Sequence, residues 1–416
     1  MLLQMTVENL WSFREPAVLS FLADPRVDHR PEQVVALPDG RQVLRMVGVF
    51  GANASGKSNL LRPLERLGGL LTRGVAPDAE IPLEPFKLQK DRLEAPRQIE
   101  LELYLEGRYW SYGLRTSRTQ VLAEWLYTRS AEAEPERLVF EREEGAPIRL
   151  GWDGLAVADQ NRRAFWSFVA EGTRPEQPFL AEARLRSGSE LAPLFRWVRS
   201  LLRTLGGAQH EQLNPDFVGP LTGEMREFLL SVSRSADTGI REFRVREFDG
   251  SSDRVAMLEE LDFYHGAPPE EGGLPLTFLE QSAGTRQLLS LVLQLLDSRN
   301  QAGQFLLGDE LDRSLHPLLF RHLLNIFADL SRSQAPPAQL LFTSHASALL
   351  DQDILSADSL WFADKDPSGN TRLHSLADYK PEQLTLLRGH LERGYLAGRF
   401  GGIPAIRPLD RSRRQP

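Results

Sequence analysis

Apolar and polar residues alternate along the first part of the chain, as they do in β-strands with one buried face. Residues 3–10 (LQMTVENL) alternate like a strand at the edge of a sheet, and residues 16–21 offer a second strand. Residues 99–105 alternate strictly, which predicts a half-exposed strand. A turn at Gly107 and a return strand over residues 109–114 follow. The region up to about residue 150 is therefore predicted to form a small antiparallel β lobe.

Short continuous apolar runs predict a second kind of strand, buried on both faces. They cover residues 44–50, 304–310 and 340–345. Residues 58–71 carry apolar side chains at spacings of three and four, which predicts a helix directly after the first run. Further strands are expected near residues 240–245 and 261–264. Buried strands interleaved with helices indicate the α/β class.

Helical spacing also dominates residues 155–235. Several prolines interrupt this stretch: Pro175, Pro178, Pro193, Pro215 and Pro220. No heptad pattern is sustained, so a long coiled coil is not expected. The predicted organisation has four parts. They are the N-terminal half of the α/β unit with the β lobe (1–150), a helical insertion (151–238), the C-terminal half of the α/β unit (239–375) and a tail (376–416).

Composition narrows the class of protein. The chain has 416 residues, of which 41% are hydrophobic and 25% charged, as expected of two or three globular folding units. It has no cysteine, which excludes disulfides, zinc-thiolate sites and thiol nucleophiles. No signal-like N-terminus or 18-residue apolar stretch is present, so we expect a cytoplasmic protein without membrane association. The net charge of -8 argues against a globally basic nucleic-acid binder but leaves a local basic groove open.

Residues 51–58 read GANASGKS and match the phosphate-binding loop G-x-x-x-x-G-K-[ST] at every defined position. Its glycines let successive backbone N–H groups point at one anion. Lys57 would bring a positive charge to the β- and γ-phosphates, and the Ser58 hydroxyl could ligate Mg²⁺. The loop falls between a predicted strand and a predicted helix, which is the arrangement that this motif requires. The sequence therefore predicts nucleoside triphosphate binding.

The second half supplies the carboxylates that such an enzyme needs. The apolar run over residues 304–310 ends in Asp309 and Glu310. In P-loop enzymes the aspartate at this place holds Mg²⁺, and a glutamate beside it can polarise the attacking water. Adjacent residues on a strand face opposite sides, but at the end of a strand the backbone can turn to present both.

Residues 278–287 (FLEQSAGTRQ) lead into a predicted helix. Ser282 and Gly284 before a helix N-terminus would make a second anion site, although Ser282 could also be only an N-cap. At this place in the chain the segment resembles the signature motif of ATP-binding-cassette (ABC) ATPases. Residues 311–317 (LDRSLHP) resemble the D-loop of the same enzymes, and residues 340–345 end in the residue that would be the switch histidine.

Taken in order, these motifs resemble the ABC-type ATPase head of the RecF, SMC and OLD group, a P-loop NTPase fold with an antiparallel β lobe and a helical insertion. Residues 9–13 (NLWSF) are similar to the Asn-Phe-Arg-Ser-Phe start of that group. The resemblance covers roughly residues 1–150 and 240–365 and leaves the middle open. It departs at the signature, which reads SAGTR, and at Trp11, where the group often has a basic residue.

The resemblance implies ATP and Mg²⁺ as ligands and assigns roles to individual residues. Glu310 would be the catalytic base, His345 would sense the γ-phosphate, and Lys57 would act on the phosphates. Ser282 and Gly284 would bind the γ-phosphate held by a partner subunit, and Asp312 would lie at the dimer seam. The remaining implied contacts are the P-loop residues Gly51, Asn53, Ser55, Gly56, Ser58 and Asn59, the Mg²⁺ ligands Ser58 and Asp309, and the Q-loop candidate Gln89.

Size and the short insertion look most like single-head prokaryotic ATPases of anti-phage and abortive-infection operons (RloA-like). Residues 395–404 (YLAGRFGGIP) resemble a C-terminal segment of those proteins. The chain shows no acidic cluster of the kind that OLD nucleases carry on a separate domain. We therefore expect an ATP-dependent homodimer that drives or regulates a partner effector, such as a nuclease encoded nearby.

Two other functions remain open from the sequence. One is a RecF-like repair ATPase that binds DNA, which a basic surface stripe would favour, whereas a neighbouring nuclease gene would favour defence. The other is the nucleotide-binding subunit of a membrane transporter, which the long insertion between P-loop and signature argues against. Whether GTP replaces ATP, and which nucleic acid is bound if any, the sequence leaves open.

Overall fold

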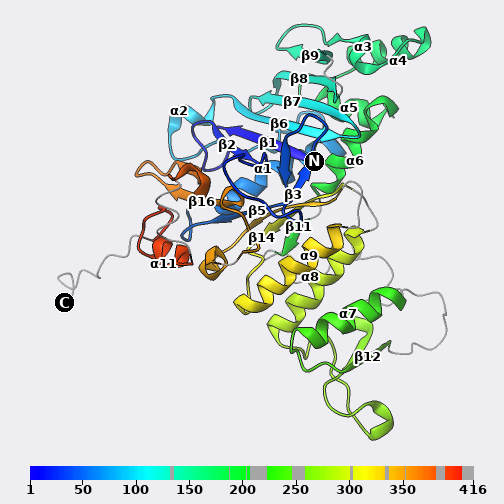
Figure 1. Cartoon of the computed structure of the whole chain (residues 1–416). Helices are drawn as coiled ribbons and strands as arrows, with labels where there is room; N and C mark the ends of the chain where they lie inside the picture. Colours follow the sequence, from blue (N-terminus) through cyan, green and yellow to red (C-terminus); the bar gives the residue numbers. More distant parts are fainter. Residues whose placement is uncertain are drawn as a thin grey trace, which may run out of the picture.

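A computed structural model describes most of the chain (Figure 1). The described residues are 1–131, 135–186, 188–202, 204–206, 223–245, 258–299, 303–332, 337–351, 353–380 and 389–404. Two of the prolines expected to interrupt the helical segment, Pro215 and Pro220, lie outside them, as does the end of the predicted tail. No helix of the described residues is long and apolar enough to cross a membrane.

A mixed sheet lies at the centre of the molecule. In the described part of the chain its strand order is β11-β14-β15-β5-β16-β17, with all neighbours parallel except the last pair. The strands are β11 (Thr204–Gly206), β14 (Phe305–Asp309), β15 (Gln339–Thr343), β5 (Met46–Phe50), β16 (Leu360–Lys365) and β17 (Thr371–Ser375). Because β5, β14, β15 and β16 are parallel, their carboxyl ends meet at one edge, where α/β proteins place ligands.

The apolar runs of the sequence become strands that are buried on both faces. Along β5, Met46 and Phe50 face one hydrophobic core, whereas Val47 and Val49 face the other. Helix α1 (Lys57–Arg73) contributes to the core shared with the β lobe. Helices α8 (Ala283–Arg299) and α9 (Pro317–Arg332) cover the opposite face, at the lower side of Figure 1. This layering confirms the α/β class.

The antiparallel β lobe lies above this sheet in Figure 1. Its order in the described residues is β10-β9-β8-β7-β6-β1-β2. The strands are β1 (Leu2–Glu8), β2 (Ala17–Ser20), β6 (Arg97–Leu105), β7 (Arg108–Thr116), β8 (Val121–Ser130), β9 (Arg137–Glu143) and β10 (Arg149–Leu150). The expectation of an edge strand over residues 3–10 is wrong, since β1 pairs with β2 on one side and β6 on the other. Its alternation reports one face turned away from the core, not an unpaired edge.

The middle of the chain is helical, as expected, but its helices pack against two different cores. Residues of α4 to α6 belong to the core of the β lobe and α1, whereas those of α7 belong to the core of α8 and α9. Between α6 and α7, β11 joins the parallel sheet beside β14. The helices are α3 (Trp152–Leu155), α4 (Gln160–Glu171), α5 (Phe179–Leu185), α6 (Ala192–Ser200) and α7 (Gly223–Ser235). Because these helices divide between two cores, the structure does not define residues 151–238 as one unit, and the single insertion stays a prediction.

The remaining elements are short. Strand β3 (Val34–Ala36) pairs antiparallel with β4 (Gln42–Leu44). Strand β12 (Glu242–Val245) pairs antiparallel with β13 (Leu261–Tyr264), and these two are the strands expected near residues 240–245 and 261–264. The short helices are α2 (Lys90–Leu93) and α11 (Leu391–Leu396), and the 3₁₀ turns are η1 (Ser189–Leu191), η3 (Leu258–Glu260), η4 (Pro269–Glu271), η5 (Ser347–Asp351), η6 (Ala357–Ser359) and η7 (Leu376–Asp378).

Candidate functional site

The P-loop connects β5 to α1 in a conformation that needs glycine at both defined positions. Gly51 has φ 154° and Gly56 has φ 109°, a region that residues with a Cβ atom rarely adopt. A Cβ atom on Gly51 would lie 2.5 Å from the Ala363 carbonyl oxygen, and one on Gly56 would lie 2.1 Å from the Thr371 hydroxyl. The loop is therefore packed against the ends of β16 and β17, and its curvature depends on the absence of side chains.

Lys57 is buried at the start of α1, with 5% of its surface exposed. Its ammonium donates to the carbonyl oxygens of Gly51 and Ala52 at 2.8 and 2.9 Å. Burial lowers the pKa of Lys57, and the negative charges of Glu310 and other nearby carboxylates oppose that shift. The lysine is thus held inside the loop, where an anion on the loop would meet its charge.

A hydroxyl and a carboxylate meet beside the loop in the way that a Mg²⁺ site requires. Ser58 Oγ donates to Asp309 Oδ1 at 2.8 Å, and Thr343 Oγ1 donates to the same oxygen at 2.7 Å. Oxygen ligands of this kind suit Mg²⁺, which in nucleotide sites takes one or two protein ligands and completes its shell with phosphate and water. Ser58 and Asp309 therefore fit the expected cation, and Thr343 fixes the carboxylate.

Glu310 is turned away from the strand direction by an unusual backbone conformation. Its φ is 48°, and its N–H donates to Thr343 Oγ1 at 2.8 Å. The Glu310 side chain is 43% exposed, and its Oε1 lies 3.6 Å from His345 Nε2. Asp312 accepts a hydrogen bond from the His345 backbone N–H at 3.0 Å. The turn at the end of β14 thus presents Glu310 at the same edge as Asp309, as the sequence suggested that it could.

These groups surround one cavity of about 720 Å³, which we call the P-loop cavity. Its lining residues are Asn53, Ala54, Gly56, Lys57, Ser58, Asn59, Glu310, His345 and Lys365. Residues far apart in sequence, at or after the ends of β5, β14, β15 and β16, therefore converge here. Lys365 was not expected from the sequence. The only signal was its place at the end of an apolar strand, and that signal is useful only once β16 is known to be parallel to β5.

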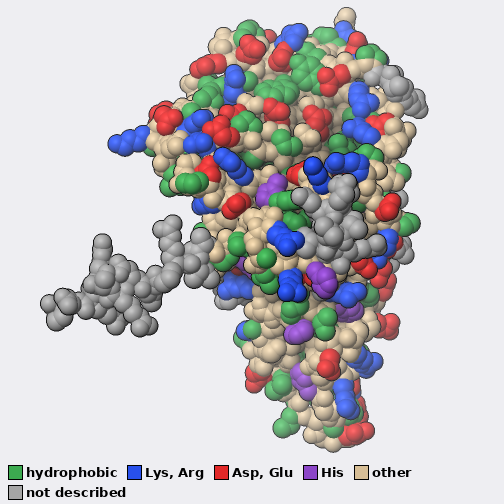
Figure 2. Space-filling model, turned by 60° about the vertical axis from the view of Figure 1, so that its left-hand side comes forward, with side chains coloured by type: hydrophobic (Ala, Val, Ile, Leu, Met, Phe, Trp, Pro, Cys, Tyr) green, Lys and Arg blue, Asp and Glu red, His purple; other side chains and the backbone are tan. Residues whose placement is uncertain are grey.

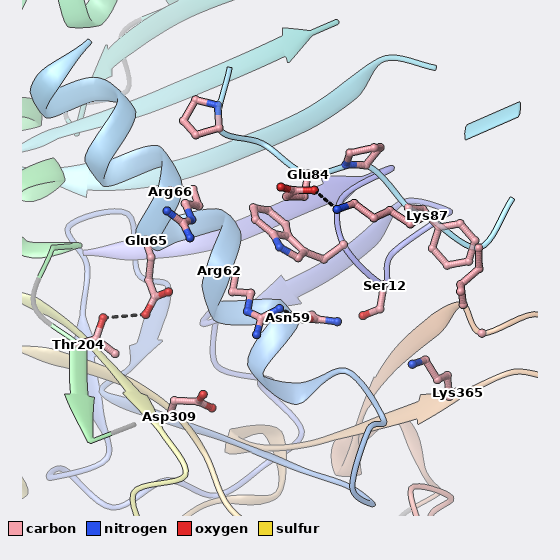
Figure 3. Close-up of a pocket in the computed structure, with 16 residues that line it drawn as sticks. Ser12, Asn59, Arg62, Glu65, Arg66, Glu84, Lys87, Thr204, Asp309 and Lys365 are labelled. Atoms are coloured by element: carbon pink, nitrogen blue, oxygen red, sulfur yellow. Dashed lines mark hydrogen bonds and ion pairs between the residues drawn. The ribbon is translucent and has the colours of Figure 1, made fainter. Parts of the chain in front are cut away.

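A second cavity of about 770 Å³ adjoins the first and shares Asn59 and Lys365 with it (Figure 3). Helix α1 contributes Arg62, Glu65 and Arg66, and residues 84–88 line the other side. Trp11 also lines this cavity. Its φ is 50°, an uncommon conformation for a bulky residue, and its backbone N–H donates to the Glu84 carbonyl oxygen at 2.9 Å. Gln89, the Q-loop candidate, follows this segment but lines neither of the two cavities.

The signature segment lies outside the P-loop cavity. Ser282 caps α8: its Oγ accepts a hydrogen bond from the Thr285 N–H at 3.1 Å. A Cβ atom on Gly284 would lie 2.7 Å from the Ser314 carbonyl oxygen, so α8 begins in contact with the turn that follows Asp312. Neither Ser282 nor Gly284 lines the cavity. The chain therefore does not bring its own signature to its own P-loop.

The C-terminal segment, residues 395–402, packs against the P-loop. A Cβ atom on Gly402 would lie 3.3 Å from the Gly51 Cα atom, and the Gly402 carbonyl accepts a hydrogen bond from the Tyr395 hydroxyl at 3.0 Å. Phe362 of β16 stacks with both Tyr395 and Phe400. This contact could not be expected from the sequence, because Gly51 and Gly402 lie at opposite ends of the chain.

The fold and this edge of the sheet define a P-loop NTPase. Comparison with protein families is more specific. Residues 46–351 match the family described as "AAA domain, putative AbiEii toxin, Type IV TA system", and the chain belongs to that family. No curated protein matches the chain.

Solved structures similar to the chain include SMC head domains. The SMC head domain from Thermotoga maritima is 14% identical, with 90% of this chain and 98% of that chain covered and a TM-score of 0.41. An SMC head bound to the C-terminal winged-helix domain of ScpA is 12% identical, covering 92% and 99%, with a TM-score of 0.43. A Pyrococcus furiosus SMC head with an extended coiled coil, bound to the C-terminal domain of ScpA, is 10% identical, covering 93% and 98%, with a TM-score of 0.41.

Proposed function

We propose that this protein binds and hydrolyses ATP with Mg²⁺ in the P-loop cavity and uses the cycle to control a partner protein. The observation that carries the proposal is that two separate strand ends, those of β5 and β14, bring Lys57, Ser58 and Glu310 to one cavity. Asp309, the last residue of β14, accepts a hydrogen bond from Ser58 beside this cavity. Each contributes a different part of the same chemistry, and a structural role for one of them would not require the others nearby.

The residues divide the work as follows. Backbone N–H groups of the loop and the Lys57 ammonium bind the phosphate oxygens. Ser58 and Asp309 would hold Mg²⁺, whose chemistry is to neutralise charge on the phosphates. Glu310 orients water and accepts its proton, since its carboxylate is exposed to the cavity and no arginine or lysine forms an ion pair with it among the described residues. His345 lines the same cavity and would bind the terminal phosphate.

The active form in this proposal is a head-to-tail homodimer that assembles on ATP. The signature serine and glycine, which stand outside their own cavity, would complete the cavity of the second copy, with Asp312 at the seam. Leu279 beside the signature is 70% exposed, and Leu318 after the D-loop is 62% exposed. Apolar side chains exposed beside the signature and after the D-loop support an interface that includes these residues.

For the biological role we propose anti-phage defence through an effector encoded nearby, as in RloA-like systems. The family description, "AAA domain, putative AbiEii toxin, Type IV TA system", supports a role in a toxin–antitoxin or abortive-infection system. The RecF-like alternative needs a basic stripe for DNA. On the face in Figure 2, the described basic and acidic side chains are interspersed, so that face does not favour it.

ATP binding tests the cavity assignment first. Titration calorimetry should detect ATP binding to the purified chain in the presence of Mg²⁺. Lys57→Ala should weaken the binding strongly, because the triphosphate loses its buried counter-charge. ATP affinity unchanged in Lys57→Ala, with the variant folded, would refute the assignment.

A mixing experiment tests the dimer. Ser282→Arg and Lys57→Ala chains should each be inactive alone, and their mixture should recover part of the hydrolysis, because one composite site is then intact. No recovery in verified mixed dimers would show that the site is complete within one subunit.

Co-expression tests the biological role. Only co-expression with the neighbouring gene should protect cells from phage, and protection should require Glu310. Full protection by this chain alone would contradict the effector proposal, and a repair defect as the only deletion phenotype would favour the RecF-like function.

A further inference from the structure

Lys365 brings a second lysine to the P-loop cavity. It is the last residue of β16, which lies beside β5 on the side opposite to β15. The P-loop follows β5 and His345 follows β15, so Lys365 and His345 approach the cavity from strands on either side of the P-loop strand. Figure 3 shows the Lys365 ammonium directed toward the start of α1, where Asn59 lies.

The Lys365 ammonium is free to bind a ligand. The side chain is exposed, and among the described residues its ammonium forms no hydrogen bond or ion pair. Two other lysines show the contrast. Lys57 is held by two loop carbonyls, and Lys87 forms an ion pair with Glu84. The backbone N–H of Lys365 donates to the Asp364 carboxylate at 2.8 Å, which fixes the strand end that carries the side chain.

The use of lysine at position 365 also favours phosphate binding. The chain has five lysines against 44 arginines, and two of the five line the P-loop cavity. Lysine is a compact, mobile point charge, whereas arginine is a rigid planar fork. A mobile ammonium is suited to following a phosphate group, and the P-loop lysine works in this way.

Asn59 and Lys365 are the residues that line both cavities. A nucleotide with its terminal phosphates at Lys57 would pass between the cavities at these two residues. We propose that Lys365 is a second phosphate-binding cation, which contacts the phosphates next to the sugar, while Lys57 binds the terminal ones. This inference rests on the proposed nucleotide site.

The test compares the affinities of the full chain for ADP and ATP, both with Mg²⁺. Lys365→Met should weaken both nucleotides by a similar factor, about tenfold, because both carry the phosphates next to the sugar and lose one charged contact. Lys365→Arg should stay within about threefold of the wild type, since it keeps the charge. Lys380→Met, which removes an exposed lysine away from both cavities, is the matched control and should bind like the wild type. The advantage of wild type over Lys365→Met should shrink as salt is raised.

Three outcomes would overturn the inference. They are equal affinities of wild type and Lys365→Met, a loss confined to ATP, and a change in ATP-over-GTP preference in place of a general loss. Lys365→Gln serves as the second variant if the unfolding temperature of Lys365→Met is lowered. If the wild type binds neither nucleotide, the proposed function itself fails, so the two failures are distinguishable.

Discussion

Replacing Glu310 with glutamine isolates one role of one carboxylate. The substitution keeps the size of the side chain and removes its negative charge and its ability to accept a proton. The backbone restraints should survive, because the Glu310 N–H bond to Thr343 and the turn at φ 48° do not involve the side chain. The fold and the P-loop should therefore be intact in the variant.

The expected loss is in hydrolysis alone. A positioned general base contributes about 10²- to 10⁴-fold, or about 3–5 kcal/mol of barrier. We expect ATP affinity to stay equal or to rise. The Glu310 side chain is 43% exposed, so solvent and salt screen the repulsion between its carboxylate and the phosphates. ATP-bound dimers should accumulate as a result.

Single-turnover hydrolysis and ATP titration should be measured on the same preparation. Size-exclusion chromatography with ATP reports the dimer. Glu171→Gln, an exposed carboxylate on α4 away from the P-loop cavity, is the matched control and should match the wild type in all three assays. Wild-type hydrolysis in Glu310→Gln would show that another group accepts the proton. Loss of ATP binding together with hydrolysis in a folded variant would show that Glu310 acts in binding.

Three further substitutions test the packing of the C-terminal segment on the P-loop, the backbone of the P-loop and the pH dependence of stability that a buried carboxyl of the β lobe causes. Gly402→Ala should weaken ATP binding more than Gly401→Ala; both have φ 65°, but only Gly402 faces the P-loop, so equal affinities would contradict a supporting role for the tail. Gly56→Ala should lower the unfolding temperature more than the control Gly107→Ala. A Cβ atom at position 107 would meet no atom within 4 Å, so the control carries only the backbone strain of a positive φ, on the order of 1–3 kcal/mol. An equal drop in the two variants would mean that the P-loop can rearrange to accommodate the Cβ atom. Burial raises the pKa of Glu124, so its carboxyl binds a proton more tightly in the folded state than in the unfolded chain. The free energy of unfolding should therefore fall as pH rises above 4.5, the pKa of the carboxyl in the unfolded chain. Glu124→Gln should reduce that slope in urea unfolding at several pH values, and an unchanged slope would assign it to other groups.

Local patterns predicted the parts of the site that are contiguous in sequence. The P-loop, its strand and its helix follow one another, so residue spacing was enough to place Lys57 and Ser58. The carboxylates at the end of β14 were predicted in the same way, because an apolar run ending in two acids is a local signal.

The parts that depend on strand order could not be predicted. Lys365 enters the cavity only because β16 lies parallel to β5, and Thr343 reaches Asp309 only because β15 lies beside β14. The edge position expected for β1 failed because alternation reports which face is buried and says nothing about pairing partners. Strand β11, three residues long, gave no signal within a helical segment. The role of Gln89 rested on resemblance alone, and it lines neither cavity.

Steady-state ATP hydrolysis by the purified full chain tests the central claim most directly. Phosphate release should be measured with Mg²⁺, with a chelator, and for Lys57→Ala prepared in parallel. Turnover that requires Mg²⁺ and is abolished in the folded Lys57→Ala variant is the predicted result. Turnover that persists in Lys57→Ala would mean that the hydrolysis takes place elsewhere, and the absence of turnover in the wild type with ATP, Mg²⁺ and its neighbouring partner would contradict the assignment of this edge of the sheet as an ATP-hydrolysing site.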